Sequence, residues 1–306
     1  MHLHLILERA CRAALHLPLL KPLLQPLLQP LLPKLSFLVR YRNERLLLEG
    51  QNRSTSVRPS MAFFTMHKAA SVYVSNVLKR LSQESGMIPI DFEAYVFMGG
   101  KTSGEVNQPG EFARQMYQPR GYFYGPFRAF NPAIEDLDQY RVVLNVRDPR
   151  DVLVSAYFSV AYSHYVPDKA NPEAAKKIRA ARESTLQANI DEWVLASTPR
   201  VLGICADYRR NLLHKPNVLL AKYEKLVTDF DGWLADITKF LEVKPAQQTL
   251  DELRRDAQFD VEESVSRHKR QVTPGDHKRK LKPETIAKLN ELFADDLREF
   301  GFPVDA

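Results

Sequence analysis

The stretch RVVLNVRDPRDVLVSAYFS, residues Arg141–Ser159, decides the fold. Its first six residues form a mostly apolar run of strand length, which is typical of a strand buried on both faces. Asp148 and Pro149 then predict the start of a helix, because aspartate caps free amides and proline fits the first helical position. We expect this helix to run from about Arg150 to Ser163. A buried strand that passes directly into a helix is the repeating unit of a parallel α/β sheet.

The same strand-to-helix pattern occurs twice more. Met61–Met66 is a short apolar run that predicts a strand. The apolar residues at 74, 77, 78 and 81 then recur at helical spacing and predict a helix that ends near Gly86. Val218–Tyr223 predicts a third strand, followed by a helix near Asp231–Leu241. Three such units predict an α/β fold with a central parallel sheet flanked by helices. Ligands of such sheets bind at the carboxyl ends of the strands.

Length and composition agree with one large domain. The chain has 306 residues, of which 44% are apolar and 26% charged, so wholesale disorder is excluded. The net charge of +6 suits an anionic ligand. The two cysteines and eight histidines show no metal-ligand spacing, and we expect no catalytic metal. So few cysteines favour a reducing compartment, and we expect the protein in the cytoplasm.

Residues 1–57 differ in composition from residues 58–306, and we interpret them as an N-terminal extension of the main domain. Prolines recur at every fourth position from 18 to 30, between leucines. A proline in every turn removes helical donors, so a long straight helix is not expected there. We expect a packed or loosely docked arm; peripheral membrane contact and organelle targeting are the alternatives. No apolar run reaches the roughly 18 residues of a membrane-spanning helix.

Two predicted loops at strand ends carry residues that suit an anion. Lys68 follows Met61–Met66, where free amides of a helix N-terminus and a lysine charge together fit a phosphate. The loop lacks the GxxxxGK[ST] pattern, and an ordinary turn with an exposed lysine is the alternative. Arg147 leaves a buried strand where its guanidinium can grip a phosphate, and Ser155 can add a hydroxyl. An arginine–aspartate cap network is the alternative for this second loop.

The run RDPRDVLVSAYFS, residues 147–159, resembles the 3′-phosphate-binding motif of sulfotransferases that use 3′-phosphoadenosine 5′-phosphosulfate (PAPS). The Lys68 loop stands where that family has its 5′-phosphosulfate loop. The segments YEKL (223–226), RQVTPGDHK (270–278) and FGFP (300–303) also resemble later family segments, in the same order. The resemblance covers about residues 60–303 and implies the P-loop-NTPase-like sulfotransferase fold.

The resemblance also implies a role for each matching residue. The implied contacts are Lys68 with the 5′-phosphate and bridging oxygen, Ser71 and the amides of Ala70, Val72 and Tyr73 with the 5′-phosphate, Arg147, Ser155 and Arg270 with the 3′-phosphate, and Tyr223 with the adenine. Lys68 would thereby stabilise the leaving group.

This chain departs from the family pattern at several positions. Ala70 stands in place of a glycine and Val72 in place of a second hydroxyl residue, so we expect a less close backbone approach and one contact fewer. Gln271 and Val272 replace Lys-Gly, and His277 replaces a tryptophan. Lys269 can supply the charge that is lost beside Arg270.

The general base is predicted from a difference between family branches. The cytosolic small-molecule branch uses a histidine between the first two motifs, and this chain has none between Lys68 and Arg147. Carbohydrate and tyrosyl-protein sulfotransferases use a glutamate soon after the first helix, and Glu93 is the best match. We predict that Glu93 takes the acceptor's proton; the alternatives are Asp91, Glu111 and His67, or a merely solvated Glu93.

Four further segments complete the predictions. The aromatic-rich stretch Met116–Phe130 is either loop packing or a wall of the acceptor pocket. The polar segment Asp168–Asn189 is expected to be a surface helix or lid, and Lys282–Phe300 an amphipathic helix. The basic run Arg267–Lys282 lacks interleaved aromatics, so we interpret it as a cofactor-closing loop and expect no nucleic-acid partner.

Together these residues predict a sulfotransferase that moves a sulfuryl group from PAPS to an acceptor hydroxyl or amine, in line and without a metal. Small-molecule, glycan, lipid and peptide acceptors all stay open. Two alternatives remain: a sulfotransferase-like module that binds a nucleotide without turnover, and a P-loop phosphotransferase.

Overall fold

The computed structural model describes residues 28, 31–100, 107–168, 170–257 and 273–304. Contacts within the chain divide it into two compact units, residues 1–52 and 53–306, and each is described by itself. The described helices of the first unit are α3 (Leu31–Arg40) and α4 (Arg42–Leu48). The recurring prolines lie outside the described residues. Among the helices that the structure describes, none combines the length and the apolar character needed to cross a membrane.

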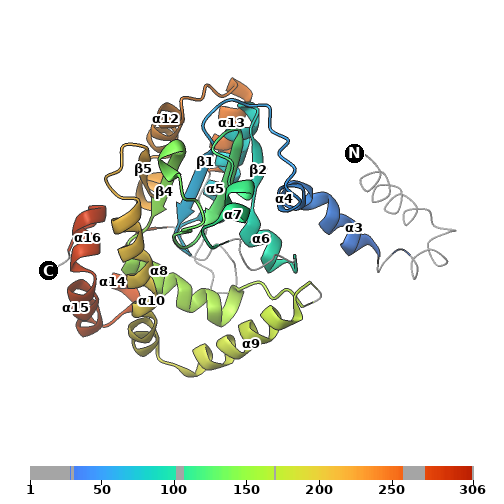
Figure 1. Ribbon diagram of the computed structural model, residues 1–306. Coiled ribbons are helices and arrows are strands. Elements are labelled where there is room, and N and C mark those ends of the chain that lie inside the picture. The colour runs from blue at the N-terminus through green and yellow to red at the C-terminus, as the bar shows by residue number, and fades with distance from the viewer. Residues whose placement is uncertain (1–27, 29–30, 101–106, 169, 258–272, 305–306) are drawn as a thin grey trace. The chain divides into compact units, whose positions relative to one another are not determined.

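The second unit alternates strands and helices (Figure 1). In chain order its elements are β1 (Met61–Thr65), α5 (Ser71–Glu84), β2 (Ile88–Ile90), α6 (Phe92–Phe97), α7 (Glu111–Met116), β3 (Tyr122–Phe127), a 3-10 turn (Leu137–Gln139), β4 (Arg141–Val146), α8 (Pro149–Phe158), a π-helical turn (Ser159–Ser163), α9 (Pro172–Gln187), α10 (Ile190–Asn211), β5 (Val218–Lys222), α11 (Tyr223–Thr228), α12 (Phe230–Leu241), α13 (Gln247–Asp256), α14 (Asp276–Lys280), α15 (Pro283–Leu292) and α16 (Ala294–Phe300).

The described strands form one five-stranded sheet in the order β2-β3-β1-β4-β5, and every pair is parallel. This confirms the predicted α/β class with a central parallel sheet. The strands β2 and β3, which follow β1 in the chain, lie on one side of it, and β4 and β5 lie on the other side. Thr65 of β1 pairs with Asn145 of β4 at their carboxyl ends. Such a reversal of strand order opens a crevice between the two following loops, which is where open α/β sheets bind ligands.

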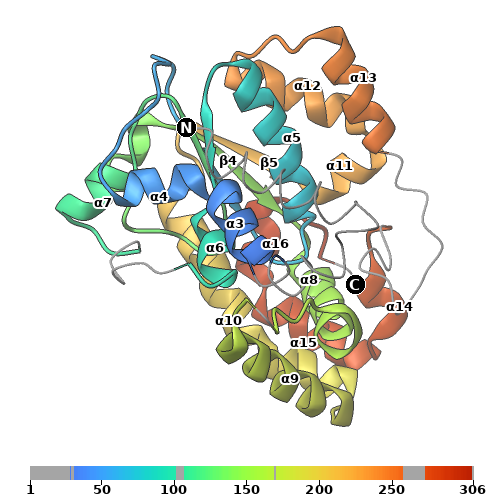
Figure 2. The same ribbon diagram turned by 90° about the vertical axis from the view of Figure 1, so that its right-hand side faces the viewer.

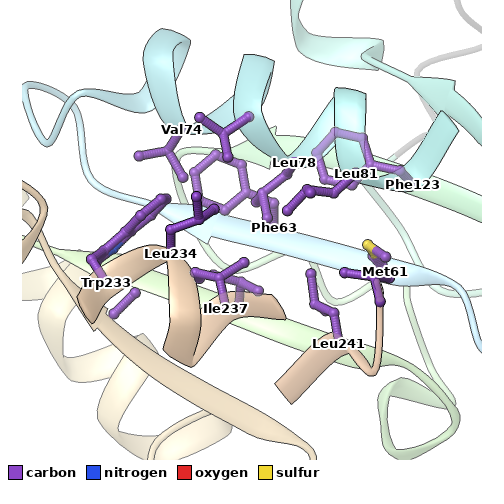
Figure 3. Packing of buried hydrophobic residues seen from close by; sticks show 14 of the residues in the cluster. Met61, Phe63, Val74, Leu78, Leu81, Phe123, Trp233, Leu234, Ile237 and Leu241 are labelled. Atoms are coloured by element: carbon purple, nitrogen blue, oxygen red, sulfur yellow. The ribbon is translucent and has the colours of Figure 1, made fainter. Parts of the chain in front are cut away.

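Alternating side chains of β1 build the core on both faces of the sheet. Met61 and Phe63 lie in a buried cluster with α5 and α12, as Figure 3 shows. The cluster also includes Val74 and Leu78 of α5 and Trp233 of α12, each at most 2% exposed. On the opposite face, Phe64 lies against the rings of Phe127 and Tyr208 from β3 and α10. Burial of these large apolar side chains is what fixes the loops at the strand ends.

The aromatic-rich stretch 116–130 contains a central strand, which the sequence analysis did not predict. β3 pairs with both β1 and β2 and is buried throughout. Gly125 and Pro126 inside it resemble a turn, but Gly125 is required by close packing: a Cβ there would lie 2.7 Å from the Phe63 carbonyl oxygen. Its φ of +132° also favours glycine. The register of β3 against β1 shifts at this point.

The predicted helices are present with adjusted ends. The helix after Arg147 ends as α-helix at Phe158 and continues as the π-helical turn. The polar segment 168–189 contains α9, and the amphipathic segment 282–300 is divided into α15 and α16 at Phe293. Pro283 opens α15, and Gly301 ends α16 in the left-handed conformation, as proline and glycine do at these positions.

Candidate anion-binding and active site

The loop between β1 and α5 has an unusual backbone. Lys68 and Ala70 adopt positive φ angles of 67° and 56°, a region that non-glycine residues occupy at a cost. Ala70 is also the N-cap residue of α5, and it supplies no side-chain hydrogen bond to the helix. The first-turn amides of α5, beginning at Ser71, have no intrahelical acceptor. The loop therefore presents amides and a lysine together at one helix N-terminus.

The end of β4 holds this loop in place. Asn145 Nδ2 donates to the Ala69 carbonyl oxygen at 2.7 Å, and Arg147 Nη1 donates to the Lys68 carbonyl oxygen at 2.9 Å. From α10, the Tyr208 hydroxyl donates to the Thr65 carbonyl oxygen at 2.7 Å. These buried donors, from β4, from the residue after it and from α10, hold the loop in addition to its own hydrogen bond from the Ala69 amide to the Met66 carbonyl oxygen at 3.4 Å.

Arg147 is buried at the centre of the site, with 3% of its surface exposed. Its guanidinium lies over the Tyr223 ring at 4.3 Å from the ring centre. Its Nε is buried and has no hydrogen-bond partner. An unsatisfied donor on a buried cation is costly, so this group favours an incoming anion. Ser155, on the α8 helix that follows Arg147, is half-buried.

A second carboxylate fixes the turn after Arg147. Glu224 Oε1 accepts a hydrogen bond from the Asp148 amide at 3.0 Å, and burial raises the pKa of Glu224 above its ordinary value. Asp148 caps α8 by accepting from the Arg150 amide at 2.9 Å. The YEKL segment therefore supports the Arg147 turn through its glutamate as well as through the Tyr223 ring.

Glu93 lies on α6 and is held by an arginine that the sequence analysis did not single out. The Arg128 amide donates to Glu93 Oε1 at 2.7 Å, and Arg128 Nη1 donates to Oε2 at 2.6 Å. Arg128 Nη2 also donates to the Ser71 hydroxyl at 3.4 Å. Desolvation raises the pKa of Glu93 above its ordinary value, although the Arg128 charge and hydrogen bonds oppose this. Its side chain stays 36% exposed, so it remains open to a reactant.

The other candidates for the base are placed differently. Asp91 caps α6 by accepting from the Ala94 amide at 2.9 Å. Glu111 is exposed at the start of α7. His67 keeps solvent contact, but desolvation and then the charges of Arg128 and Arg200 lower its pKa to about 3. An imidazole with such a pKa is a weak proton acceptor, which leaves Glu93 as the strongest candidate.

Most of the predicted site residues lie at the carboxyl ends of the strands, after β1, β2, β4 and β5. The residues brought together by the contacts above are Lys68, Ala70, Ser71, Glu93, Arg147 and Tyr223. Val72 and Tyr73 follow in the first turn of α5. Arg270, Gln271, Val272 and Lys269 lie outside the described residues. Within the described part of the chain, no group of three or more His, Cys, Asp or Glu side chains is arranged to hold a metal ion.

Arg128 could have been found from the sequence only if β3 had been recognised. Like Arg147, it comes directly after a buried strand, and parallel strands bring such residues to one edge of the sheet. Gly125 and Pro126 obscured that strand. Asn145 carried a weaker signal, as a polar residue near the end of a mostly apolar strand.

The fold and the site define a class, the α/β proteins of P-loop-NTPase-like architecture with an anion site at the carboxyl ends of adjacent strands. A family model described as the sulfotransferase domain matches residues 107–301, which is more than half of the chain. The chain belongs to the sulfotransferase domain family. No curated protein sequence matches it.

Solved structures include several with a similar course of the chain. Mouse sulfotransferase SULT7A1 complexed with PAP (adenosine 3′,5′-bisphosphate) has 13% identity and a TM-score of 0.53, covering 83% of this chain and 87% of that chain. Sulfotransferase STF9 from Mycobacterium avium has 10% identity and a TM-score of 0.48, covering 92% and 86%. Retinol dehydratase in a complex with retinol and PAP has 15% identity and a TM-score of 0.45, covering 83% and 86%. The likeness to the mouse protein bears on the fold alone.

Proposed function

We propose that this sulfotransferase-family enzyme moves a sulfuryl group from PAPS to an acceptor hydroxyl or amine. The observation that carries the proposal is Arg147, a buried cation whose Nε has no partner. Its Nη1 is bonded to the Lys68 carbonyl of the adjoining loop. The Arg147 guanidinium, which suits the 3′-phosphate, is therefore fixed to the Lys68 loop, which suits the 5′-phosphosulfate. A nucleotide with phosphates on both its 3′ and 5′ sides requires two such groups side by side.

The residues present fit PAPS. The uncapped first turn of α5 and Lys68 suit the 5′-phosphosulfate, because amides and a lysine together stabilise a concentrated negative charge. Arg147 and Ser155 suit the 3′-phosphate, and Tyr223 and Arg270 complete the proposed contacts with adenine and 3′-phosphate. When bound, PAPS supplies the sulfuryl group and a polyanionic leaving group.

The chain's own residues then have three tasks. Lys68 and the α5 amides stabilise the charge that grows on the leaving phosphate; preorganised donors of this kind are the largest contribution in many enzymes. Glu93 removes the proton from the acceptor oxygen or nitrogen. Arg128 donates hydrogen bonds to both Glu93 and Ser71, so it holds the base at a fixed position relative to the start of α5.

The acceptor is proposed as a small molecule, with glycan and lipid hydroxyls as the other classes. Support for where the acceptor binds comes from Glu93, whose side chain is 36% exposed and is linked through Arg128 to Ser71 at the start of α5.

The test is calorimetric titration of the full chain with PAP and with AMP, which lacks the 3′-phosphate. We expect the wild type to prefer PAP, and Arg147→Ala to lose about 10- to 100-fold of PAP affinity, as expected when hydrogen bonds to a charged group are lost. Arg210→Ala is the matched control, because Arg210 is 73% exposed and pairs only with Asp207 among the described residues.

Equal affinity of the wild type for PAP and AMP would contradict the proposal. Tight PAP binding without turnover on a broad acceptor panel would instead favour the binding module. A requirement for ATP and Mg²⁺ would favour the phosphotransferase.

A further inference from the structure

The Asp151 carboxylate is a buried junction between α8 and the segment 273–280. The Gly275 amide donates to Asp151 Oδ2 at 2.7 Å, and the His277 amide donates to Oδ1 at 2.9 Å. His277 Nδ1 also lies 2.6 Å from Oδ1, and it is the donor because an ionised carboxylate only accepts. The side chains of Asp151 and His277 are 0% and 2% exposed. Figure 2 shows α14, which contains His277, beside α8.

The same carboxylate faces Arg147. Asp151 Oδ2, in the first turn of α8, lies 3.8 Å from Nη2 of Arg147, which precedes the helix. Arg147 is thus oriented from three sides: by the Lys68 carbonyl, by the Tyr223 ring and by the Asp151 charge. The 3.8 Å separation is longer than a hydrogen bond. Asp151 therefore attracts Arg147 Nη2 without accepting a hydrogen bond from it.

The groups around Asp151 favour its charged form. Burial by itself would raise the pKa of Asp151, but the His277 hydrogen bond and the Arg147 charge outweigh it and lower the pKa to about 2. The three donors from residues 275 and 277 share that charge. If the His277 side-chain donor is removed, the Asp151 carboxylate loses one hydrogen bond and attracts Arg147 more strongly. A direct ion pair between Asp151 and Arg147 then becomes the favoured arrangement.

We propose that Asp151 and His277 are positioning residues that keep Arg147 available to the 3′-phosphate, so that selectivity for a 3′-phosphorylated nucleotide depends on this buried pair. The inference rests on the proposed function, because it assumes a ligand whose 3′-phosphate contacts Arg147. The pair acts through Arg147, and the proposal gives neither member a contact with the reacting atoms.

The test compares two variants that differ in one donor position. In His277→Asn the amide nitrogen takes the place of Nδ1, whereas in His277→Gln it takes the place of Nε2, away from Asp151. Calorimetry on the full chain gives the ratio of PAP affinity to AMP affinity for each. His214→Gln is the control, because His214 is 72% exposed and contacts Glu299 at the surface.

We expect the PAP-to-AMP ratio to fall about tenfold in His277→Gln with AMP affinity unchanged, and to return towards the wild-type value in His277→Asn. A purely structural role for His277 would weaken both ligands alike or lower the melting temperature without changing the ratio. If His277→Gln does not keep the wild-type circular dichroism, His277→Phe removes the same donor at similar volume.

An unchanged ratio in a folded variant without the donor, in a protein whose wild type prefers PAP, overturns this inference and leaves the proposed function intact. A wild type that does not prefer PAP overturns the proposed function and this inference with it.

Discussion

A carboxylate held by an arginine can act as a base only if it stays open to the reactant, and Glu93 meets this condition. Both oxygens accept from Arg128, yet the side chain is 36% exposed. We predict that Glu93→Gln lowers kcat by about 10²- to 10⁴-fold, the range of a general base. Steady-state sulfuryl transfer from PAPS gives the number, and Glu111→Gln, at an exposed acid, is the matched control.

The pH profile offers an independent check on the same residue. Desolvation raises the pKa of Glu93 above 4.5, so the base is lost by protonation at a higher pH than an ordinary glutamate would be. The acid limb of kcat/KM is therefore expected above pH 4.5, and it disappears in Glu93→Gln. Unchanged turnover in that variant would remove Glu93 from the mechanism.

The backbone of Ala70 should affect the stability of the protein, because this non-glycine residue adopts a left-handed conformation. Ala70→Gly is expected to raise the free energy of unfolding by up to about 1 kcal/mol, since the backbone strain outweighs the added flexibility of the unfolded chain. The neighbouring Ala69 is fully buried and has no positive φ, so Ala69→Gly is expected to lower it. Urea titration measures both, and a loss of stability in Ala70→Gly would contradict the argument.

At the residue scale, the sequence pointed to Lys68 and Arg147 as candidate ligand-binding residues, but it did not reveal the contacts that hold them. Arg147 directly follows a buried strand and Lys68 lies in the loop after another, where a charged residue suggests a ligand without knowledge of its partners. Arg128, Asp151 and His277 act through partners far away in the chain, at separations of up to 126 residues. No local pattern reveals such partners, because they meet only when the sheet forms.

At the scale of elements, Arg150 ties α8 to the end of the described chain. It is fully buried and bonds Asp148 Oδ2 at 2.6 Å, Asn290 Oδ1 at 2.6 Å and the Pro303 carbonyl oxygen at 2.8 Å. We predict that Arg150→Ala lowers the free energy of unfolding by about 3–5 kcal/mol, since it leaves a buried carboxylate without its cation.

The control is Arg298→Ala, at an exposed pair with Asp295 in which Arg298 is 67% exposed. It should change stability by less than about 0.5 kcal/mol. Guanidinium or thermal unfolding of both variants decides the point. Equal, small effects would mean that Arg150 does not join these elements energetically.

The strands β1, β4 and β5 could be predicted because each is a mostly apolar run that is followed by a helix. β2 has only three residues, too few for a pattern to stand out. β3 contains Gly125 and Pro126, which normally mark a turn, and tertiary packing against Phe63 overrides that signal. The division of α15 from α16 at Phe293 was likewise invisible, because the apolar spacing continues across it.

At the scale of the whole molecule, all residues of the candidate site belong to the unit 53–306. We predict that a chain beginning at Arg53 keeps its PAP affinity within about twofold of the full chain, as expected for sites that do not couple. Calorimetry on both chains measures this. A loss of more than tenfold would show that residues 1–52 supply part of the site.

The buried bond from Arg150 to Pro303 spans 153 residues of sequence, which has a consequence for biosynthesis. At a synthesis rate of about 5–20 residues per second, Arg150 is synthesised roughly 8–30 s before Pro303. During that interval Arg150 and Asp148 of the nascent chain lack the acceptor at Pro303. The turn that follows Arg147 therefore reaches its final set of hydrogen bonds only after residue 303 has been synthesised.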